Sequence, residues 1–349
     1  MDRLGRLPVT IAIATLAACI SPTGEVDEAD PDVDTEAIAR FGDHGRVKIA
    51  WLNSDPSNTY DDANLDGVRA VAAGEHATVS PFYSYFDPAL QLEQCLEVVR
   101  ERRHDAIVII PVDAVGIIPC VAAARHRGIP VVASDLPIGP DISTVEPQVP
   151  GQAGAVLVPP ATWGDELTPM VVSLCAGHSP CNVVYLAGSF DVANDQVALA
   201  RLEAAAAADP RLHLIAEEAF YDRGLAASLT AAILQQQPAI HVLIGAGDQM
   251  AQGAEDAVAA AGGSSTIRII GAGAGAYGVG AVRAGRWYAT FVALPNDEGR
   301  LSARIAIRAA RCQHIWDRGI DPVERRGLPS FFTRDNQAQF GSFTAQWPG

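Results

Sequence analysis

The sequence is short of basic side chains. It holds 25 lysine and arginine residues against 41 aspartate and glutamate residues, which gives a formal net charge of −16 at pH 7. A surface of this sign repels the phosphates of nucleic acids and the headgroups of anionic lipids. The composition therefore argues against nucleic acid as a partner and against docking on an anionic membrane by charge alone.

Motifs of hydrolytic enzymes are also missing. The chain contains no G-x-S-x-G sequence, which would carry a nucleophilic serine, and no H-E-x-x-H zinc motif. Its eight histidines are dispersed, and a paired acid such as Glu217-Glu218 is typical of a solvated face. We therefore expect a protein that is not an enzyme and that holds no metal.

No long hydrophobic run occurs beyond the N-terminal segment. Residues 1–19, MDRLGRLPVTIAIATLAAC, carry two arginines, then a short apolar stretch and small residues. This is the pattern of a secretion signal and is too short for a spanning helix. Its end, Leu16-Ala-Ala-Cys19, resembles a bacterial lipobox, in which the acylated cysteine becomes the new N-terminus. We expect an exported protein, lipid-anchored through Cys19 to the bacterial cell envelope and facing the periplasm or the cell exterior.

The segment that follows the anchor has little apolar material. Residues 20–44 are rich in acidic residues and proline. Such a segment cannot bury enough apolar surface to fold, and its charges extend it. We predict an acidic, disordered tether there, with a folded body from about residue 45.

Cysteine is scarce but informative. An exported chain meets oxidising conditions, so disulfides are the default interpretation. Cys175 and Cys181 flank a short segment that includes His178, and we favour a disulfide between them, with zinc ligation or free thiols as alternatives. Cys95 and Cys120 can pair if their helices are neighbours.

Strand-like and helix-like segments alternate along most of the chain. In the first half the predicted strands are residues 46–52, 78–86, 105–112 and 129–135, with helix-like segments between them. After a proline-rich stretch the alternation restarts, with strands at 182–189, 212–220, 241–247, 267–273 and 287–294. The pattern predicts an α/β protein with two similar halves, each a parallel sheet with helices on both faces. Its ligand should lie where the carboxyl ends of the strands face a crevice.

Several stretches together carry a family resemblance from Arg46 to Phe340. They are KIAWLNSDPSNTYDDANLDGVRAVA, HDAIVIIPVDAVGIIPCVAAARHRGIPVVASD, VLIGAGDQMAQGAEDAVAAAG, IRIIGAGAGAYGVGAVRAGRWYATFVALP and LPSFFTRDN. The chain resembles the type I periplasmic sugar-binding proteins of the ribose and galactose type, which serve ABC importers. The resemblance implies two doubly wound parallel-sheet lobes joined by a three-strand hinge that closes on a ligand. We assign residues 45–143 plus 294–325 to an N-terminal lobe and residues 144–293 plus 326–343 to a C-terminal lobe.

The sequence Gly273-Ala-Gly275-Ala-Tyr-Gly278 fits the G-x-G-x-x-G fingerprint of dinucleotide-binding proteins. However, position 293, about twenty residues on, is alanine where an acid would bind the ribose. The fingerprint also follows a late strand of its half rather than the first. We therefore expect no cofactor.

The resemblance places ligand-binding residues at the strand ends. Asn58 and Tyr60 would contribute an amide and an aromatic plane to a sugar, and Asp135 would accept two sugar hydroxyls. Asp248 also follows a strand and can equally serve as a helix N-cap. The full candidate set is Asn58, Tyr60, Asp61, Asp135, Phe190, Asp191, Asn194, Asp248 and Gly273.

Departures from the family pattern limit the choice of ligand. The frequent arginine after the acid is Leu136 here, the frequent arginine near 194 is Asn194, and the frequent acid at 273 is Gly273. With several acids and no obvious arginine, a neutral polyol or an amine could be held, whereas an anion would be repelled.

These features together predict a solute-binding lipoprotein, expected to be monomeric, that captures a monosaccharide or polyol and delivers it to an ABC permease. The alternative is a ligand-sensing lipoprotein that signals to a membrane receptor. Ligand binding alone would be identical in both.

Overall fold

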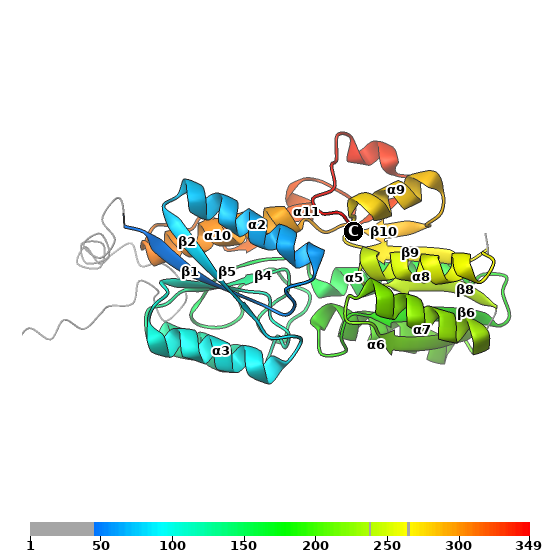
Figure 1. Ribbon diagram of the computed structural model, residues 1–349, viewed down its shortest axis with the longest axis horizontal. Coiled ribbons are helices and arrows are strands. Elements are labelled where there is room, and N and C mark those ends of the chain that lie inside the picture. The colour runs from blue at the N-terminus through cyan, green and yellow to red at the C-terminus, as the bar shows by residue number, and fades with distance from the viewer. Residues whose placement is uncertain (1–44, 237–238, 264–265) are drawn as a thin grey trace, which may run out of the picture.

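The computed structural model describes residues 45–349 except 237–238 and 264–265, and it contains two α/β lobes side by side (Figure 1). The predicted signal sequence, the lipidation site Cys19 and the tether at 20–44 lie outside the described residues. Among the helices that are described, none is long and apolar enough to cross a bilayer.

The first lobe is built on a six-stranded parallel sheet in the order β11-β5-β4-β3-β1-β2. Its strands are β1 (Val47–Asn53), β2 (Ala77–Tyr83), β3 (Ala106–Ile109), β4 (Val131–Ser134), β5 (Gln152–Val156) and β11 (Gly319–Ile320). Strands β3 and β4 are continuous runs of buried apolar or small residues, as a parallel sheet covered on both faces requires.

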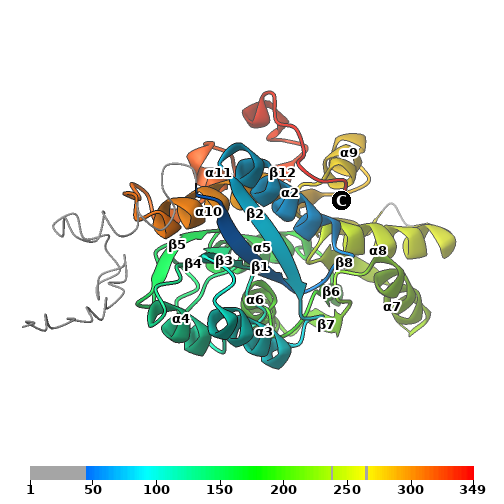
Figure 2. The same ribbon diagram turned by 60° about the vertical axis from the view of Figure 1, so that its left-hand side comes forward.

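Helices cover both faces of the first sheet (Figures 1 and 2). They are α2 (Thr59–Gly74), α3 (Pro88–Glu101), α4 (Ile118–Arg125) and α10 (Pro295–Ala310). Leu65 of α2 and Ala303 of α10 share one core cluster, while Cys95 of α3 and Cys120 of α4 share the cluster on the opposite face. The first lobe is therefore a three-layer unit.

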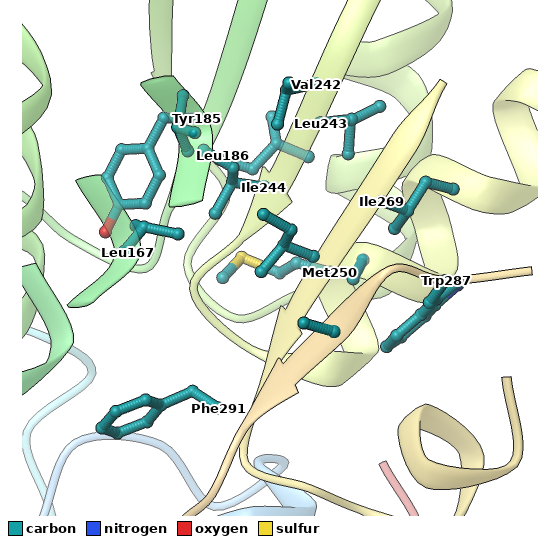
Figure 3. Close-up of a cluster of buried hydrophobic side chains, with 14 of the residues drawn as sticks. Leu167, Tyr185, Leu186, Val242, Leu243, Ile244, Met250, Ile269, Trp287 and Phe291 are labelled. Carbon is teal, nitrogen blue, oxygen red and sulfur yellow. The ribbon is translucent and has the colours of Figure 1, made fainter. Parts of the chain in front are cut away.

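The second lobe repeats this plan in the order β12-β10-β9-β8-β6-β7, and only β12 runs antiparallel to its neighbour. Its strands are β6 (Cys181–Ala187), β7 (Leu212–Glu218), β8 (Ile240–Gly245), β9 (Arg268–Ala272), β10 (Ala289–Phe291) and β12 (Phe331–Thr333). Its helices are α5 (Pro160–Leu174), α6 (Ala193–Ala208), α7 (Arg223–Gln236), α8 (Asp248–Ala260), α9 (Ala276–Ala284), the short α11 (Pro322–Arg325) and the 3₁₀ helix at Gln337–Phe340. Figure 3 shows part of its core, where Met250 of α8 packs among side chains of β6, β8 and β9.

The chain crosses between the lobes three times: from β5 to α5, from β10 to α10, and from β11 to β12. The domain division predicted from the sequence places residues from 144 onward in the second lobe, but β5 pairs with β4 and lies in the first sheet. This strand is short and follows a proline-rich stretch, which hides the alternation of strand and helix. The first crossing therefore comes one strand later than predicted.

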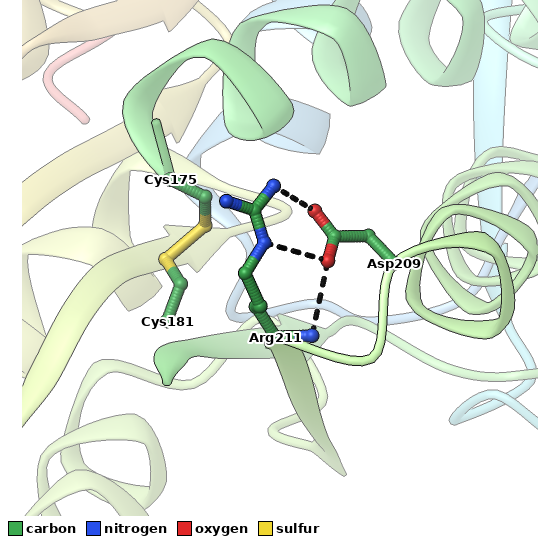
Figure 4. Close-up of polar contacts among 4 residues, drawn as sticks. All are labelled: Cys175, Cys181, Asp209 and Arg211. Atoms are coloured by element: carbon green, nitrogen blue, oxygen red, sulfur yellow. Dashed lines mark hydrogen bonds and ion pairs between the residues drawn. A yellow bond between two sulfur atoms is a disulfide. The ribbon is translucent and has the colours of Figure 1, made fainter. Parts of the chain in front are cut away.

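Two disulfides lie within the lobes. Cys95–Cys120 links α3 to α4, and Cys175–Cys181 links the end of α5 to the start of β6. Beside the second bridge, the backbone N–H of Cys181 donates to the carbonyl of Arg211, whose guanidinium pairs with Asp209 at 2.7 Å (Figure 4). Cys175 and Cys181 therefore form the favoured disulfide and are not zinc ligands. The described residues contain no cluster of metal-ligating side chains.

Candidate functional site

A pocket lies between the lobes, where the carboxyl ends of strands from both sheets converge. Its walls come from the segments after β1, β2, β3, β4, β6, β7, β8 and β9, from the crossover segments and from the C-terminal tail. This is the position expected for a ligand in an open α/β sheet. Because both lobes form the walls, the pocket depends on their relative placement.

Three residues of the pocket wall have a left-handed backbone conformation. Phe86 (φ 60°), Asp135 (φ 62°) and Tyr221 (φ 55°) follow β2, β4 and β7. A non-glycine residue with this φ is strained, and such strain concentrates at ligand-binding sites. The Phe86 and Tyr221 rings stack with centroids 5.8 Å apart, which joins equivalent loops of the two lobes.

Two carboxylates share one phenol. The Tyr60 hydroxyl lies 2.9 Å from Asp135 Oδ1 and 3.0 Å from Glu298 Oε2. Tyr60 stands in the first turn of α2, where the Asn58 side chain caps the helix by accepting from the Tyr60 N–H at 3.0 Å. A hydroxyl donates one proton, so it satisfies one of these carboxyl groups, and the other must carry its own proton or find a further donor.

Burial dominates the electrostatics of the acids. It raises the pKa of Asp135 to about 6, and it raises the pKa of Asp61 well above its ordinary value. Burial, and after it the charge of Asp135, raises the pKa of Glu298 well above the usual range. Burial likewise raises the pKa of Tyr60, so its hydroxyl keeps its proton at neutral pH. No lysine, arginine or histidine stands among the described pocket residues to offset these charges.

Several polar atoms of the pocket have no hydrogen-bond partner within the described part of the chain. They are Asp61 Oδ2, Asn194 Oδ1, Gln249 Oε1 and Glu298 Oε1. All four are acceptors. A buried acceptor without a donor is costly, so the pocket favours a ligand that brings donors.

Aromatic rings form the apolar walls. Trp163 and Phe291 of the second lobe contact edge to face with centroids 5.1 Å apart, and Tyr60 and Trp347 do so at 5.4 Å. Rings of this kind pack against C–H faces or attract a cation over their faces. The pocket thus combines aromatic surface with acceptor oxygens.

Trp347 reaches the pocket from the C-terminal tail, which crosses the junction of the lobes (Figure 1). Its indole N–H donates to the Gly273 carbonyl at 2.8 Å, and its own carbonyl accepts from the Ala276 N–H at 2.9 Å. Gly273 has φ +114°, and a Cβ there would overlap the Trp347 ring. The glycines that spell a dinucleotide fingerprint therefore make room for this tryptophan and, at Gly278, for the Asp248 carboxylate.

The structure brings six of the nine sequence-predicted residues to the pocket wall and three elsewhere. Those at the wall are Asn58, Tyr60, Asp61, Asp135, Asn194 and Gly273. They come from loops at strand ends or from the first turn of the following helix. Their role in binding stays a prediction.

Asp248 corrects the sequence-based interpretation, because its side chain points into the second lobe rather than into the pocket. Its carboxylate accepts from the Thr290 hydroxyl and from the Gly275 N–H, each at 2.7 Å. Burial raises its pKa to about 7. Its strand-end position is as predicted, but it holds β10 and the start of α9 together. It makes no side-chain cap to its own helix.

Phe190 and Asp191 also lie outside the pocket wall. Phe190 packs against the second-lobe core, and the Asp191 side chain is exposed. Asp195, in the first turn of α6, is fully buried beside this loop. It accepts from the Gly188 and Ser189 N–H groups at 3.0 Å and from the hydroxyls of Tyr185 and Tyr221. Asp195 thereby orients Tyr221, a wall residue.

Sequence reasoning missed several wall residues: Phe86, Trp163, Tyr221, Gln249, Glu298 and Trp347. Phe86 ends the predicted strand 78–86 and Tyr221 directly follows the predicted strand 212–220, so the strand-end rule could have found them. Glu298 has the appearance of an ordinary first-turn acid of α10. Trp347 lies beyond the segment of family resemblance, and no periodic pattern marks it.

The two lobes, their parallel sheets and the pocket between them define the type I fold of periplasmic binding proteins, as predicted. A family model described as a periplasmic binding protein domain matches residues 49–313. The chain therefore belongs to this family, whose members are binding proteins and not enzymes. A search of curated proteins finds no match.

Solved structures share the fold at low sequence identity. An ABC transporter solute-binding protein from Mycobacterium smegmatis with bound glycerol is 21% identical, with a TM-score of 0.71, over 87% of this chain and 100% of that one. One from Actinobacillus succinogenes with bound D-allose is 21% identical (TM-score 0.67; 84% and 99%). The Caulobacter myo-inositol binding protein is 19% identical (TM-score 0.70; 85% and 96%).

Proposed function

We propose that the protein is an extracytoplasmic solute-binding lipoprotein, anchored through Cys19, that captures a small sugar-like ligand between its lobes and delivers it to an ABC permease. The observation that carries this proposal is the pocket itself, whose aromatic and acceptor-bearing walls come from both lobes. A ligand there contacts both lobes at once, so binding stabilises one relative placement of the lobes. A membrane partner can distinguish that placement from the open one.

The solved relatives support the ligand class. The proteins named above were crystallised with glycerol, D-allose and myo-inositol, all of them small polyhydroxylated molecules. The pocket described here has the matching ingredients, since rings can cover C–H faces and carboxylates can accept hydroxyl protons.

Thermal melting of the purified protein tests this function with a panel of monosaccharides, polyols and their amino derivatives. A ligand that binds only the folded state, at about a hundred times its Kd, adds about 2.7 kcal/mol of stability. We expect at least one compound of the panel to raise the Tm of the wild type. The same compound should raise the Tm of the Asp135→Asn variant much less. If no compound of the panel changes the Tm of either protein, the proposed function is contradicted.

The membrane partner is tested separately. Permease and ATPase genes beside the gene for this chain, and loss of uptake of the identified ligand when it is deleted, are the outcomes expected for an importer. A neighbouring sensor kinase gene with unchanged uptake would support the alternative of ligand sensing.

A further inference from the structure

The charge balance of the pocket is one-sided. Asp61, Asp135 and Glu298 bring three carboxylates to its wall, and no cationic side chain stands among the described residues that line it. Within the described chain no ion pair involves any of the three. Buried charges in proteins are normally paired, because an unpaired one loses its hydration without compensation.

The fully buried side-chain atoms of the pocket wall that lack a hydrogen-bond partner within the described residues are all oxygens. Asp61 is 5% exposed, Glu298 is fully buried and Gln249 is 9% exposed, and each has an oxygen without a donor. A sugar hydroxyl brings one proton and also needs donors for its own oxygen, whereas an ammonium group brings three N–H donors and no acceptor. Acceptors without partners are therefore better matched by an ammonium than by another hydroxyl.

The Tyr60 bridge adds a further demand for positive charge. With its one proton placed toward either Asp135 or Glu298, the other carboxyl group at about 3 Å must carry its own proton or receive one from a ligand. A cation close to this pair would satisfy that carboxyl group and reduce the repulsion between the two carboxylates. Tyr60, Trp163 and Trp347 line the same pocket, and aromatic rings also attract cations over their faces.

From this combination we propose that the pocket selects a protonated amino polyol, such as an amino sugar or an aminocyclitol, over the neutral polyol of the same size. This inference rests on the proposed function and names its ligand class. The hydroxyls of such a ligand meet the amide groups of Asn58 and Asn194, and its ammonium meets the carboxylates.

Matched pairs of probes test the inference by isothermal titration calorimetry on the full protein at pH 7.5. Glucosamine is compared with glucose, galactosamine with galactose, and an aminocyclitol with myo-inositol, while N-acetylglucosamine keeps the ring but removes the charge. We expect the amine of at least one pair to bind about tenfold or more tighter than its neutral partner. N-acetylation should abolish that gain.

Isosteric variants locate the effect. Asp61→Asn and Glu298→Gln keep shape and remove charge, and each should reduce the amine preference toward unity, because affinity for the amine falls more than affinity for its neutral partner. Asp62→Asn, on the exposed side of the same helix, is the matched control and should keep the preference. Melting curves of the ligand-free variants check that each is folded.

The outcomes separate this inference from the proposed function. Equal or tighter binding of the neutral partners overturns the amine preference and leaves the sugar-binding function standing. If a simple diamine such as putrescine binds as tightly as the best amino polyol, the hydroxyl groups do not contribute to recognition. That result overturns the inference that the ligand is a polyol. No binding by any sugar, polyol or amine overturns both.

Discussion

At the scale of single residues, Asp135 and Asp248 show that a strand-end position does not fix a role. Both follow a parallel strand, but the Asp135 carboxylate meets Tyr60 in the pocket and the Asp248 carboxylate meets Thr290 inside the second lobe. The direction of the side chain decides between them. For Asp135 that direction comes with a left-handed backbone, φ 62°.

Asp135→Asn should weaken ligand binding and stabilise the ligand-free protein above pH 7. The variant removes a hydrogen bond to a charged acceptor, which contributes about 1.5–3 kcal/mol, or about 10- to 150-fold in Kd. It also removes a buried carboxylate whose ionisation opposes folding. Calorimetric titration and melting curves measure the two effects. Asp191→Asn, exposed and outside the pocket wall, is the control and should change neither; a normal Kd in Asp135→Asn would contradict its place in the site.

Asp248→Ala should instead lower stability and leave affinity nearly unchanged. The substitution orphans the buried Thr290 hydroxyl and Gly275 N–H, each at a cost of about 1–3 kcal/mol. Chemical denaturation measures the loss, and titration of the folded variant measures Kd. A large change in Kd with unchanged stability would restore Asp248 to the list of ligand-binding residues.

At the scale of elements, the C-terminal tail forms part of the pocket wall. Residues 346–348 bridge the lobes: Gln346 accepts from the Asp297 N–H of α10 at 3.0 Å, and Pro348 accepts from the Tyr277 N–H of α9 at 2.9 Å. Trp347 sits between them, held on Gly273 and against the Tyr60 ring. The tail thus supplies both a wall and a connection between lobes.

Trp347→Ala should raise Kd by about tenfold, because an aromatic contact contributes about 0.5–1.5 kcal/mol beyond the apolar area that it buries. Trp347→Phe keeps a ring in place and should retain most of the affinity. Titration with the ligand found in the panel measures both variants. Equal affinity in the alanine variant would show that the tail is not part of the ligand contact.

The part of the fold and of the candidate site that the sequence predicts also differs from element to element. The regular alternation predicts two parallel-sheet lobes, because β-branched runs and amphipathic helices carry strong local signals. Strand β5 is missed because its few residues follow a proline-rich stretch. The tail carries no periodic pattern, and where it packs depends on the cavity left beside Gly273 and Gly275, which only the assembled lobes define. Glu298 is missed for the same reason, since its neighbours Tyr60 and Asp135 are far away in the chain.

At the scale of the whole molecule, the buried acids make stability depend on pH. Burial raises the pKa of Asp135 and of Asp195 to about 6, and that of Asp248 to about 7, from unfolded values near 4. A group with a raised folded pKa binds more protons when folded, so stability increases as the pH falls through the folded pKa. His104 and His241 have pKa values lowered by burial, and they oppose the trend below about pH 6.5.

The ligand-free protein should therefore melt at a higher temperature at pH 6 than at pH 8. Calorimetric Tm values across this range measure the effect, and Asp248→Asn should flatten it. A Tm that rises steadily from pH 6 to pH 8 would contradict the prediction, because it would show that burial does not raise the pKa of these carboxylates.

The placement of the tryptophans gives the molecule a built-in optical signal. Of the five tryptophans in the chain, Trp163 and Trp347 line the pocket and are nearly inaccessible to solvent, whereas Trp316 is 83% exposed. A ligand that settles between the first two indoles changes their surroundings, while Trp316 contributes a constant, quenchable background. Iodide should therefore remove the Trp316 emission and leave that of the buried indoles, of which Trp51 and Trp287 lie outside the pocket wall and give a constant signal. A change in the remaining emission then reports the pocket indoles, and unlabelled protein can report ligand arrival on the millisecond scale of a stopped-flow mixer.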